Sequence, residues 1–452
     1  MDSLMQFLDQ NPHIPYAKIQ DPRYASLRTS FIEDDSVIPQ IIIRPQSAAD
    51  VSLLIPILRN ESTPFAIRSG GHDLFSRSQA HDGVTIDMRD IAHVHVTKDR
   101  TSAHVGGGIV FQDLATRLDD VGLTTACPVA GEIGYVGWAT HGGYGTLSAL
   151  YGLGVDQILG AKLVTANGLV IDADDELLKG IRGAGGLFGV VVELTIRVYP
   201  IYGYLGGVIH FPSPSVSDTI HIFHRSYSAL CNETTVPPNL GMFQAIGNPE
   251  LPTYSILFLW ASPSAHDMAE GDLWLKKIIS LAPSAVHTVN KIVLSEFLGI
   301  SRNFLSGPFY GRVYTINIRS LTPEALDILA RGGESLPRGT HASISLHQLR
   351  GSHAEPNSTV FSARYPHYVV EIVSVAESES AANKAEQWGK DVLNDFRSDQ
   401  SDNVLPGSYI NLTPSDEVDI DAVYGDCGVS LLRRLKTKYD PANVFQNAIV
   451  RF

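Results

Sequence analysis

Phe65-Ala66-Ile67-Arg68-Ser69-Gly70-Gly71-His72 is the stretch that decides the fold of this chain. Residues 65–68 are typical of a strand, and the strand runs directly into paired glycines and a histidine. Because glycine has no Cβ, the main-chain N–H groups of such a turn can approach a ligand closely and cradle a phosphate or pyrophosphate. The same residues would also suit a tight surface turn with an ordinary exposed histidine. A second element is needed to choose between these interpretations.

Glycines gather at two further places inside otherwise apolar sequence. One run is Gly142-Gly143-Tyr144-Gly145, and the other is GAGGLFG at residues 183–189. Such density suggests backbone packed against a flat or extended ligand, although a set of crowded turns would give the same pattern. Ser148 and Phe188 break the GxGxxG spacing of dinucleotide-binding sites, which disfavours a Rossmann site for NAD. Walker, HExxH and GxSxG motifs are absent from the sequence.

The elements around these turns predict an α+β fold. Residues 37–200 alternate short β-rich runs with helical spacing at 48–59 and 110–121. From about residue 202 the elements are longer, with helices expected at 215–230, 265–281, 323–331 and 377–397, and strands at 254–260, 313–318, 342–349 and 368–375. This second pattern is typical of one antiparallel sheet covered by helices. A basic amphipathic helix at 431–445, stopped by Asp440-Pro441, is expected near the C-terminus.

Composition narrows the class of protein. With 452 residues, 44% hydrophobic and 18% charged, the chain can form substantial cores, and two or three domains are expected. A net charge of −14 without any Lys/Arg run predicts no binding to nucleic acid or to anionic lipid. The three cysteines lie too far apart for a disulfide framework. No signal peptide or membrane span is apparent, so a cytoplasmic protein is expected.

Six motifs occur in an order that resembles the berberine-bridge-enzyme-like oxidases of the vanillyl-alcohol-oxidase superfamily. They are IRSGGHD (67–73), GVTIDMRDI (83–91), GGGIVFQDL (106–114), GGYGTLSALYGLGVDQILGAKLVTANG (142–168), IRGAGGLFGVVVELTIRVYP (181–200) and KTKYDPANVF (436–445). The chain is also similar to 6-hydroxynicotine oxidases and to fungal secondary-metabolite oxidases. The resemblance implies a two-lobed, PCMH-type FAD-binding domain at residues 1–204, a substrate-binding domain at 205–412, and a C-terminal segment, 413–452, that returns to the first domain.

The resemblance also implies the cofactor and how it is held. The family attaches the 8α-methyl carbon of FAD to the histidine of the RSGGH motif, which is His72 here. Many members add a second link through a cysteine, but that position falls on Ala130, and Cys127 lies three residues early. We therefore expect a single link through His72 and none through Cys127. The flavin contacts implied by the motifs are Arg68, Ser69, Gly70, Gly71, His72, Gly131, Gly134, Gly137, Gly142, Gly143, Tyr144, Gly145, Val191 and Asn443.

Departures from the family pattern supply one candidate catalytic residue. His141 replaces the first glycine of the GGGxG run, and Glu132 lies in the same flavin-facing loop. An imidazole beside a flavin can act as an acid or base near neutral pH. A histidine satisfied by a backbone carbonyl is an equally good interpretation. Leu187 replaces an asparagine of the family, and Leu431 falls in a region that has lost a family arginine.

Two further candidates come from the second domain. In the strand at 342–349, alternation puts Ser343, Ser345 and His347 on one face, which would line a ligand cavity or meet solvent. Tyr409 begins the family's late Tyr-x-Asn element and could act as a base if its pKa were lowered. Two histidine pairs, His93/His95 and His221/His224, have conceivable metal spacing, but without a third ligand no metal site is expected.

The resemblance predicts an FAD-dependent oxidase. A base, Tyr409, His347 or His141, would take a proton from a small organic substrate, hydride would pass to flavin N5, and dioxygen would restore the flavin and yield hydrogen peroxide. The substrate class implied is a secondary metabolite such as an alkaloid, polyketide or terpenoid intermediate. A non-redox isomerase or cyclase that retains the flavin is an alternative that Glu132 and His141 favour. The departures at Leu187 and Leu431 leave a catalytically inactive ligand-binding protein as a second alternative. The sequence leaves the oligomeric state open.

Overall fold

Strands of the first two hundred residues divide between two sheets. The computed structural model describes residues 1–305, 307–351, 358–398, 402–407 and 409–451. In the first sheet the strand order is β1 (Tyr16–Lys18), β2 (Ile41–Ile43), β4 (Val84–Asp87) and β3 (Phe65–Arg68). Strands β2 and β3 both pair with β4 in parallel, and helix α3 (Ala48–Asn60) makes the connection between them. Helix α1 (Asp2–Gln10) packs on α3, and Leu4, Leu54 and Leu58 are buried in that layer.

The second sheet is antiparallel and carries the glycine-rich segments on its flank. Its order is β5 (Val94–Val96), β6 (Ser102–Gly106), β10 (Val190–Arg197), β8 (Ile158–Val164) and β9 (Val170–Asp172). The helices of this lobe are α4 (Phe111–Asp119), α5 (Tyr135–Thr140), α6 (Ser148–Tyr151), α7 (Gly154–Gln157) and α8 (Asp175–Ala184). The two sheets are the two lobes expected from the sequence.

A third sheet of nine strands makes up most of the rest of the chain. It runs β15 (Val286–His287), β12 (Gly203–Phe211), β14 (Thr253–Ser262), β13 (Leu240–Gly247), β18 (Ser343–Leu349), β19 (His367–Ala376), β17 (Tyr310–Ile318) and β20 (Val404–Leu405), with β16 (Asn290–Ile292) also paired to β12. Every pairing is antiparallel, as expected. The domain boundary expected between residues 204 and 205 falls inside β12, which begins at Gly203.

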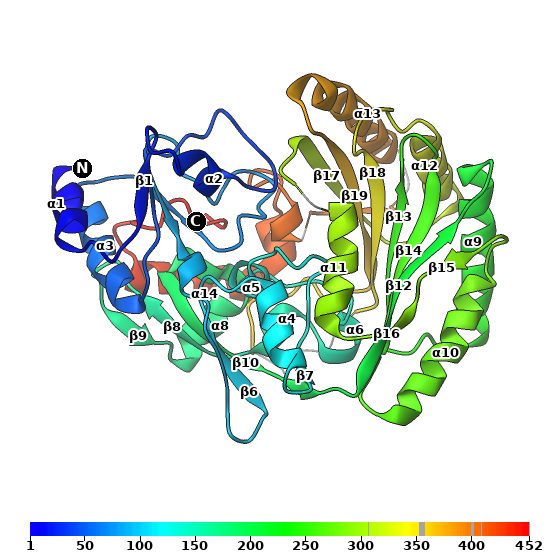
Figure 1. Cartoon of the computed structure of the whole chain (residues 1–452), viewed down its shortest axis with the longest axis horizontal. Helices are drawn as coiled ribbons and strands as arrows, with labels where there is room; N and C mark the ends of the chain where they lie inside the picture. The colour runs from blue at the N-terminus through cyan, green and yellow to red at the C-terminus, as the bar shows by residue number, and fades with distance from the viewer. Residues whose placement is uncertain (306, 352–357, 399–401, 408, 452) are drawn as a thin grey trace.

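Helices cover one face of this sheet and leave the other to the first two lobes. Figure 1 shows α9 (Val216–Glu233), α10 (Ala265–Ile279), α12 (Pro323–Glu334) and α13 (Glu379–Ser398) on the side away from the lobes. Alternation along β18 sends Ile344 and Leu346 into the core beneath these helices. Ser345 and His347 therefore lie on the opposite face. Helix α11 (Leu294–Leu305), which the sequence pattern did not reveal, contacts α4 on that side.

The end of the chain returns to the first part of the molecule. Helix α14 (Ile420–Tyr439) contacts α8, and the last residues lie among the N-terminal elements in Figure 1. The helix ends at Tyr439, directly before the expected stop at Asp440-Pro441, and the Asp440 carboxylate then accepts from the N–H groups of Val444 and Phe445 and turns the chain. The side-chain amide of Asn447 then donates to the Phe65 carbonyl oxygen (2.9 Å). No described helix is long and apolar enough to cross a membrane.

Candidate active site

A cavity lies where the two lobes, helix α5 and the C-terminal segment meet. Glycine backbone forms part of its wall, at Gly70, Gly71, Gly107, Gly134, Gly137 and Gly186. Apolar side chains and a few polar ones complete it, and among them are Ile133, Val190, Val191, Phe445, Ser69, His72, His141, Tyr409, Asn411 and Asn447. Residues from both lobes and from the C-terminal part of the chain therefore border one hollow.

His72 stands at the wall of this cavity, in the turn that follows β3. Gly71 takes a φ of +73°, a conformation that suits glycine. A Cβ on Gly70 would lie 2.4 Å from the Gly134 nitrogen, so the two turns touch backbone to backbone. Burial lowers the pKa of the His72 imidazole, and the charge of Glu132 acts in the opposite direction. Nε2 of His72 is buried and has no hydrogen-bond partner among the described residues.

Arg68 points away from the cavity. It is buried, and its guanidinium donates to the carbonyl oxygens of Leu27 (2.7 Å), Arg28 (3.2 Å) and Thr29. Burial lowers the pKa of Arg68 to about 10, so the group stays charged at neutral pH. Its side chain anchors a neighbouring segment, whereas Ser69, Gly70, Gly71 and His72 border the cavity.

The predicted glycines divide into those that border the cavity and those that pack elsewhere. Gly134 and Gly137 border it, but Gly131 packs against Gln112. The run at 142–145 does not line the cavity. A Cβ on Gly142, Gly143 or Gly145 would collide with Phe361, Gly154 or the Cys127 carbonyl oxygen, respectively. These three glycines thus allow close packing between segments.

His141 borders the cavity and is hydrogen-bonded to the backbone. Its Nδ1 donates to the Gly137 carbonyl oxygen (2.9 Å), since a carbonyl can only accept. Burial lowers the pKa of His141 to about 4. The imidazole is therefore neutral over the ordinary pH range, which matches the second interpretation made from the sequence.

Tyr409 also borders the cavity, beside Tyr144. The two rings lie 4.3 Å apart, and Asn411 Nδ2 donates to the Tyr409 hydroxyl oxygen at 3.5 Å. Arg77 forms an ion pair with Asp73 (2.7 Å) and donates to the Asn411 carbonyl oxygen (3.3 Å), which ties this loop to the His72 turn. Burial raises the pKa of Tyr409 to about 12, against hydrogen bonds that favour the phenolate. The lowered pKa that a tyrosine base requires is not found.

Strands β18 and β19 bring together an acid and a base that face the lobes. Ser345 is paired with Glu371 across the strands, and the Glu371 carboxylate accepts from Ser345 Oγ (2.9 Å) and His347 Nε2 (3.1 Å). Only 12% of the Glu371 side chain and 15% of that of His347 are exposed, so the pair is shielded from bulk water. Burial acts to raise the pKa of Glu371, but the hydrogen bonds from His347 and Ser345 and the charge of His72 outweigh it and lower the pKa.

Glu371 was missed by sequence reasoning. The one signal is a single carboxylate in the otherwise apolar strand YVVEIVSV at residues 368–375. A charge at such a position is costly unless it is paired, so it marks a site worth examining. Its charge acts to raise the pKa of both His72 and Tyr409.

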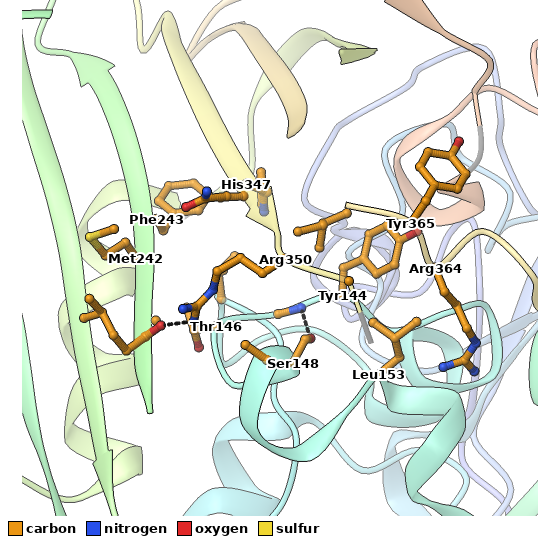
Figure 2. A pocket seen from close by; sticks show the side chains of 18 of the residues that line it. Tyr144, Thr146, Ser148, Leu153, Met242, Phe243, His347, Arg350, Arg364 and Tyr365 are labelled. Carbon is orange, nitrogen blue, oxygen red and sulfur yellow. Dashed lines mark hydrogen bonds between the residues drawn. The ribbon is translucent and has the colours of Figure 1, made fainter. Parts of the chain in front are cut away.

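A second, smaller cavity opens beside His347 (Figure 2). It lies between residues 144–153 of the second lobe and strands β13 and β18. The Phe243 ring packs edge-on against His347, with centroids 4.6 Å apart, and Tyr144 and Tyr365 add aromatic surface. Two arginines of the lining are engaged: Arg350 donates to the Pro237 carbonyl oxygen (2.8 Å), and Arg364 pairs with Asp156 (2.7 Å).

Of the remaining predicted residues, one borders the cavity and two lie elsewhere. Val191 borders the first cavity, but Asn443 is exposed in the turn after α14, with a φ of +51°. Asn447, four residues later, borders the cavity instead. Cys127 is buried in the core, 3.4 Å from Thr146 Oγ1, and burial raises the pKa of its thiol to about 12. Among the described residues no cluster could hold a metal ion.

The residues around the first cavity fit FAD. A Cβ added to Gly137 or Gly186 would meet no protein atom within 4 Å, so it would enter space that the cavity leaves for a ligand. Apolar walls suit an aromatic ring system, and the unpartnered Nε2 of His72 offers a buried nitrogen at the wall.

Comparison with known proteins decides the family. Residues 39–174 match the family described as FAD binding domain, and residues 408–449 match the one described as berberine and berberine like. The FAD-linked oxidoreductase aurO of Gibberella zeae is 33% identical over 449 residues, which cover 98% of this chain and 87% of that protein. The chain belongs to the berberine-bridge-enzyme-like family of FAD-linked oxidoreductases. FAD is therefore its cofactor, and it is an oxidoreductase.

Other proteins share its sequence in part or its fold throughout. The (R)-6-hydroxynicotine oxidase of Paenarthrobacter nicotinovorans is 36% identical over 197 residues, 42% of this chain and 43% of that enzyme. The structure of 6-hydroxy-D-nicotine oxidase from Arthrobacter nicotinovorans superposes with a TM-score of 0.78 at 23% identity, covering 96% of this chain and 97% of that one. Berberine bridge enzyme from Eschscholzia californica gives 0.80 at 18% identity, covering 99% and 98%. The expected α+β fold is thereby confirmed.

Proposed function

We propose that this chain is an FAD-dependent oxidase that acts on a small organic substrate at the junction of the two cavities. The observation that carries the proposal is the contact between the two cavities. Tyr409 borders the first cavity with His72, and its ring centroid lies 4.3 Å from that of Tyr144, which lines the second cavity with His347. His347 is in turn hydrogen-bonded to Glu371. A cofactor held at His72 would therefore share one space with an acid–base pair. Bound FAD supplies the redox chemistry, since it accepts a hydride at N5 and an oxidase returns the electrons to dioxygen as hydrogen peroxide.

The chain's own residues divide the remaining work. The glycine turns around Gly70 and Gly134, which border the cavity, would hold the cofactor's phosphates through backbone N–H groups. His72 provides a single covalent link to the flavin. Cys127 provides none, because its sulfur is buried in the core and burial strongly disfavours the thiolate.

His347 is the base that the geometry favours among the three candidates. Its Nε2 proton is committed to Glu371, so in the neutral form Nδ1 is left to accept a proton from the substrate. The Glu371 carboxylate would stabilise the imidazolium that forms. Tyr409, with a pKa raised to about 12, and His141, with Nδ1 bound to a carbonyl, are less suited to that role. Tyr409 instead supplies a ring wall beside Tyr144.

The substrate is proposed to be flat, aromatic and uncharged. Aromatic rings of Phe243, Tyr144 and Tyr365 line the second cavity, and its two arginines already have partners. A hydroxyl or amine on the substrate would meet His347. Such a molecule agrees with a secondary-metabolite intermediate, and one relative is named as an oxidase of hydroxynicotine.

Spectroscopy and peroxide release test the proposal together. Purified protein and a His72→Ala variant are precipitated with acid, and flavin absorbance is measured in pellet and supernatant. We expect flavin in the wild-type pellet and in the variant's supernatant. A panel of aromatic alcohols and amines is then tested for anaerobic bleaching of the flavin and for one peroxide per product in air.

The other outcomes separate the alternatives. Product formed without oxygen consumption or peroxide would identify a non-redox isomerase or cyclase. Ligand-induced spectral shifts without bleaching by any compound would favour a binding protein. Wild-type flavin found entirely in the supernatant would contradict the covalent link through His72 but leave the oxidase assignment standing.

A further inference from the structure

Residues 27–31 form a strap across the outer side of the His72 turn. Arg68, at the start of the turn, donates to the carbonyl oxygens of the strap's first three residues. The Phe31 N–H, at the strap's other end, donates to the Gly71 carbonyl oxygen (3.0 Å). Between them Gln79 Nε2 donates to Ser30 Oγ (3.0 Å). The strap is thus fastened on both sides of the residue proposed to hold the flavin.

The strap places one aromatic ring flat against His72. The Phe31 and His72 rings are stacked, with centroids 4.0 Å apart and an interplanar angle of 15°. Phe31 is held in turn by Phe309, whose ring meets it edge-on at 5.8 Å and whose N–H donates to the Phe31 carbonyl oxygen (3.0 Å). The ring of Phe31 therefore has little freedom to turn aside.

The Phe31 ring lies flat against the imidazole of His72 and restrains its plane. Nε2 of His72 has no hydrogen-bond partner among the described residues. Burial, to which the stacked ring contributes, lowers the pKa of the imidazole and favours the neutral form, whose free nitrogen lone pair is the nucleophile.

We propose that Phe31 is a positioning residue for the covalent attachment of FAD to His72. The inference rests on the proposed His72 link. In attachment a bond forms between an imidazole nitrogen and the 8α carbon, that carbon loses one hydrogen and the imidazole loses its N–H proton. The two electrons pass through the flavin to dioxygen, which leaves as hydrogen peroxide. The Phe31 ring holds the imidazole at the angle from which its nitrogen meets the 8α carbon.

The test follows attachment itself, independently of turnover. Wild type, Phe31→Leu and Phe31→Tyr are produced under riboflavin limitation, supplied with FAD in air, and sampled for acid-precipitable flavin over time. Total bound flavin is measured on the same samples before precipitation. Phe31→Leu should bind flavin but attach it on the order of ten- to a hundred-fold more slowly, because a reacting group held slightly out of place loses that much rate. Phe31→Tyr, which keeps a flat ring, should attach it near the wild-type rate.

A matched control separates positioning from packing. Phe309→Leu removes a ring of the same size from the same apolar cluster but leaves the ring stacked on His72. It should slow attachment far less than Phe31→Leu, because the main-chain hydrogen bond from residue 309 to the Phe31 carbonyl oxygen remains and still holds the strap. If Phe31→Leu fails to fold, Phe31→Met replaces it, because the flexible apolar side chain of methionine fills the volume but has no flat ring.

Two results would overturn the proposal. Attachment at the wild-type rate in Phe31→Leu, or equal slowing in Phe31→Leu, Phe31→Tyr and Phe309→Leu, would show that the stacked ring does not orient His72. In both cases the His72 link itself would stand. If the wild type has no acid-precipitable flavin, the His72 link fails, and the role of Phe31 falls with it.

Discussion

The glycine-lined cavity around His72 and the polar face of strands β18 and β19 differ in what they offer a reaction. On the cavity side, two candidate catalytic groups are each held in one protonation state: His141 is neutral, with a pKa of about 4, and Tyr409 is a phenol, with a pKa of about 12. On the sheet side, Glu371 and His347 form a shielded hydrogen-bonded pair. We infer that the lobes hold the cofactor through backbone geometry and that the sheet supplies proton transfer.

The largest effect should come from a substitution that forces the two glycine turns apart. In Gly70→Ala the added Cβ would lie 2.4 Å from the Glu132 carbonyl oxygen and from the Gly134 nitrogen, and neither backbone atom can rotate away. We expect loss of bound flavin and of about 1–3 kcal/mol of stability. Flavin absorbance per protein and urea unfolding measure the two effects. Gly299→Ala, where a Cβ meets no atom within 4 Å, is the control; if both variants keep their flavin, backbone contact is not what shapes the cradle.

The next effect tests where proton transfer takes place. Glu371→Gln leaves His347 without its carboxylate partner, so turnover should fall roughly 100-fold, as when a general base loses its function. Tyr409→Phe should cost about ten-fold or less, the loss of one or two hydrogen bonds. Steady-state rates with the best substrate decide the order. A larger loss for Tyr409→Phe would move the base from the sheet to the cavity wall.

The pH profile of the same variants sharpens this assignment. Because the pKa of Glu371 is lowered, its carboxylate is ionised at neutral pH and protonated only in acid, where the wild-type rate should decline. Glu371→Gln should lose the part of the acid decline that protonation of this carboxylate causes, while keeping its low rate at neutral pH. An unchanged acid limb in the variant would assign the decline to another group.

A smaller effect concerns stability and separates His141 from catalysis. Its folded pKa of about 4 lies below the unfolded value, so stability is full above pH 6.5 and is lost as the pH falls toward 4. Each such histidine contributes roughly 2–3 kcal/mol to that loss, and His224 shares the shift. In His141→Gln the difference between urea unfolding at pH 7 and pH 4.5 should shrink, whereas the exposed His266→Gln should leave it unchanged. Equal slopes in His141→Gln and wild type would contradict burial of a neutral His141.

Local sequence patterns predicted the structural features that depend only on residues close together along the chain. The strand–glycine–histidine order at 65–72 gave the turn, and alternation in 342–349 gave the face that carries Ser345 and His347. Glu371 could not be found in this way. Its role depends on the pairing of β18 with β19, which sets Ser345 opposite it, and pairing register is a tertiary property.

The direction in which a side chain points was the other feature that the sequence could not predict. Arg68 belongs to the motif, yet it points to the strap and away from the cavity, because three carbonyl oxygens there satisfy its guanidinium. Asn443 and Asn447 are both asparagines of the last segment, and only the turn at Asp440 decides that the second reaches the cavity. The glycines at 142–145 signalled close approach correctly, but their partners are other segments of the chain.

The smallest expected effect is at Cys127, and a small effect would show that this residue takes no part in flavin attachment. The thiol lies in the core with Thr146 as its neighbour, and burial raises its pKa to about 12, so almost none is thiolate at neutral pH. Cys127→Ala should therefore leave the flavin in the acid pellet unchanged and cost only about 1 kcal/mol of stability, that of a small cavity. Peptide mapping of the pellet should find flavin on the His72 peptide alone. Flavin on a Cys127 peptide would show that the core around this residue opens to the cofactor, and the cavity side would then offer reactive chemistry of its own.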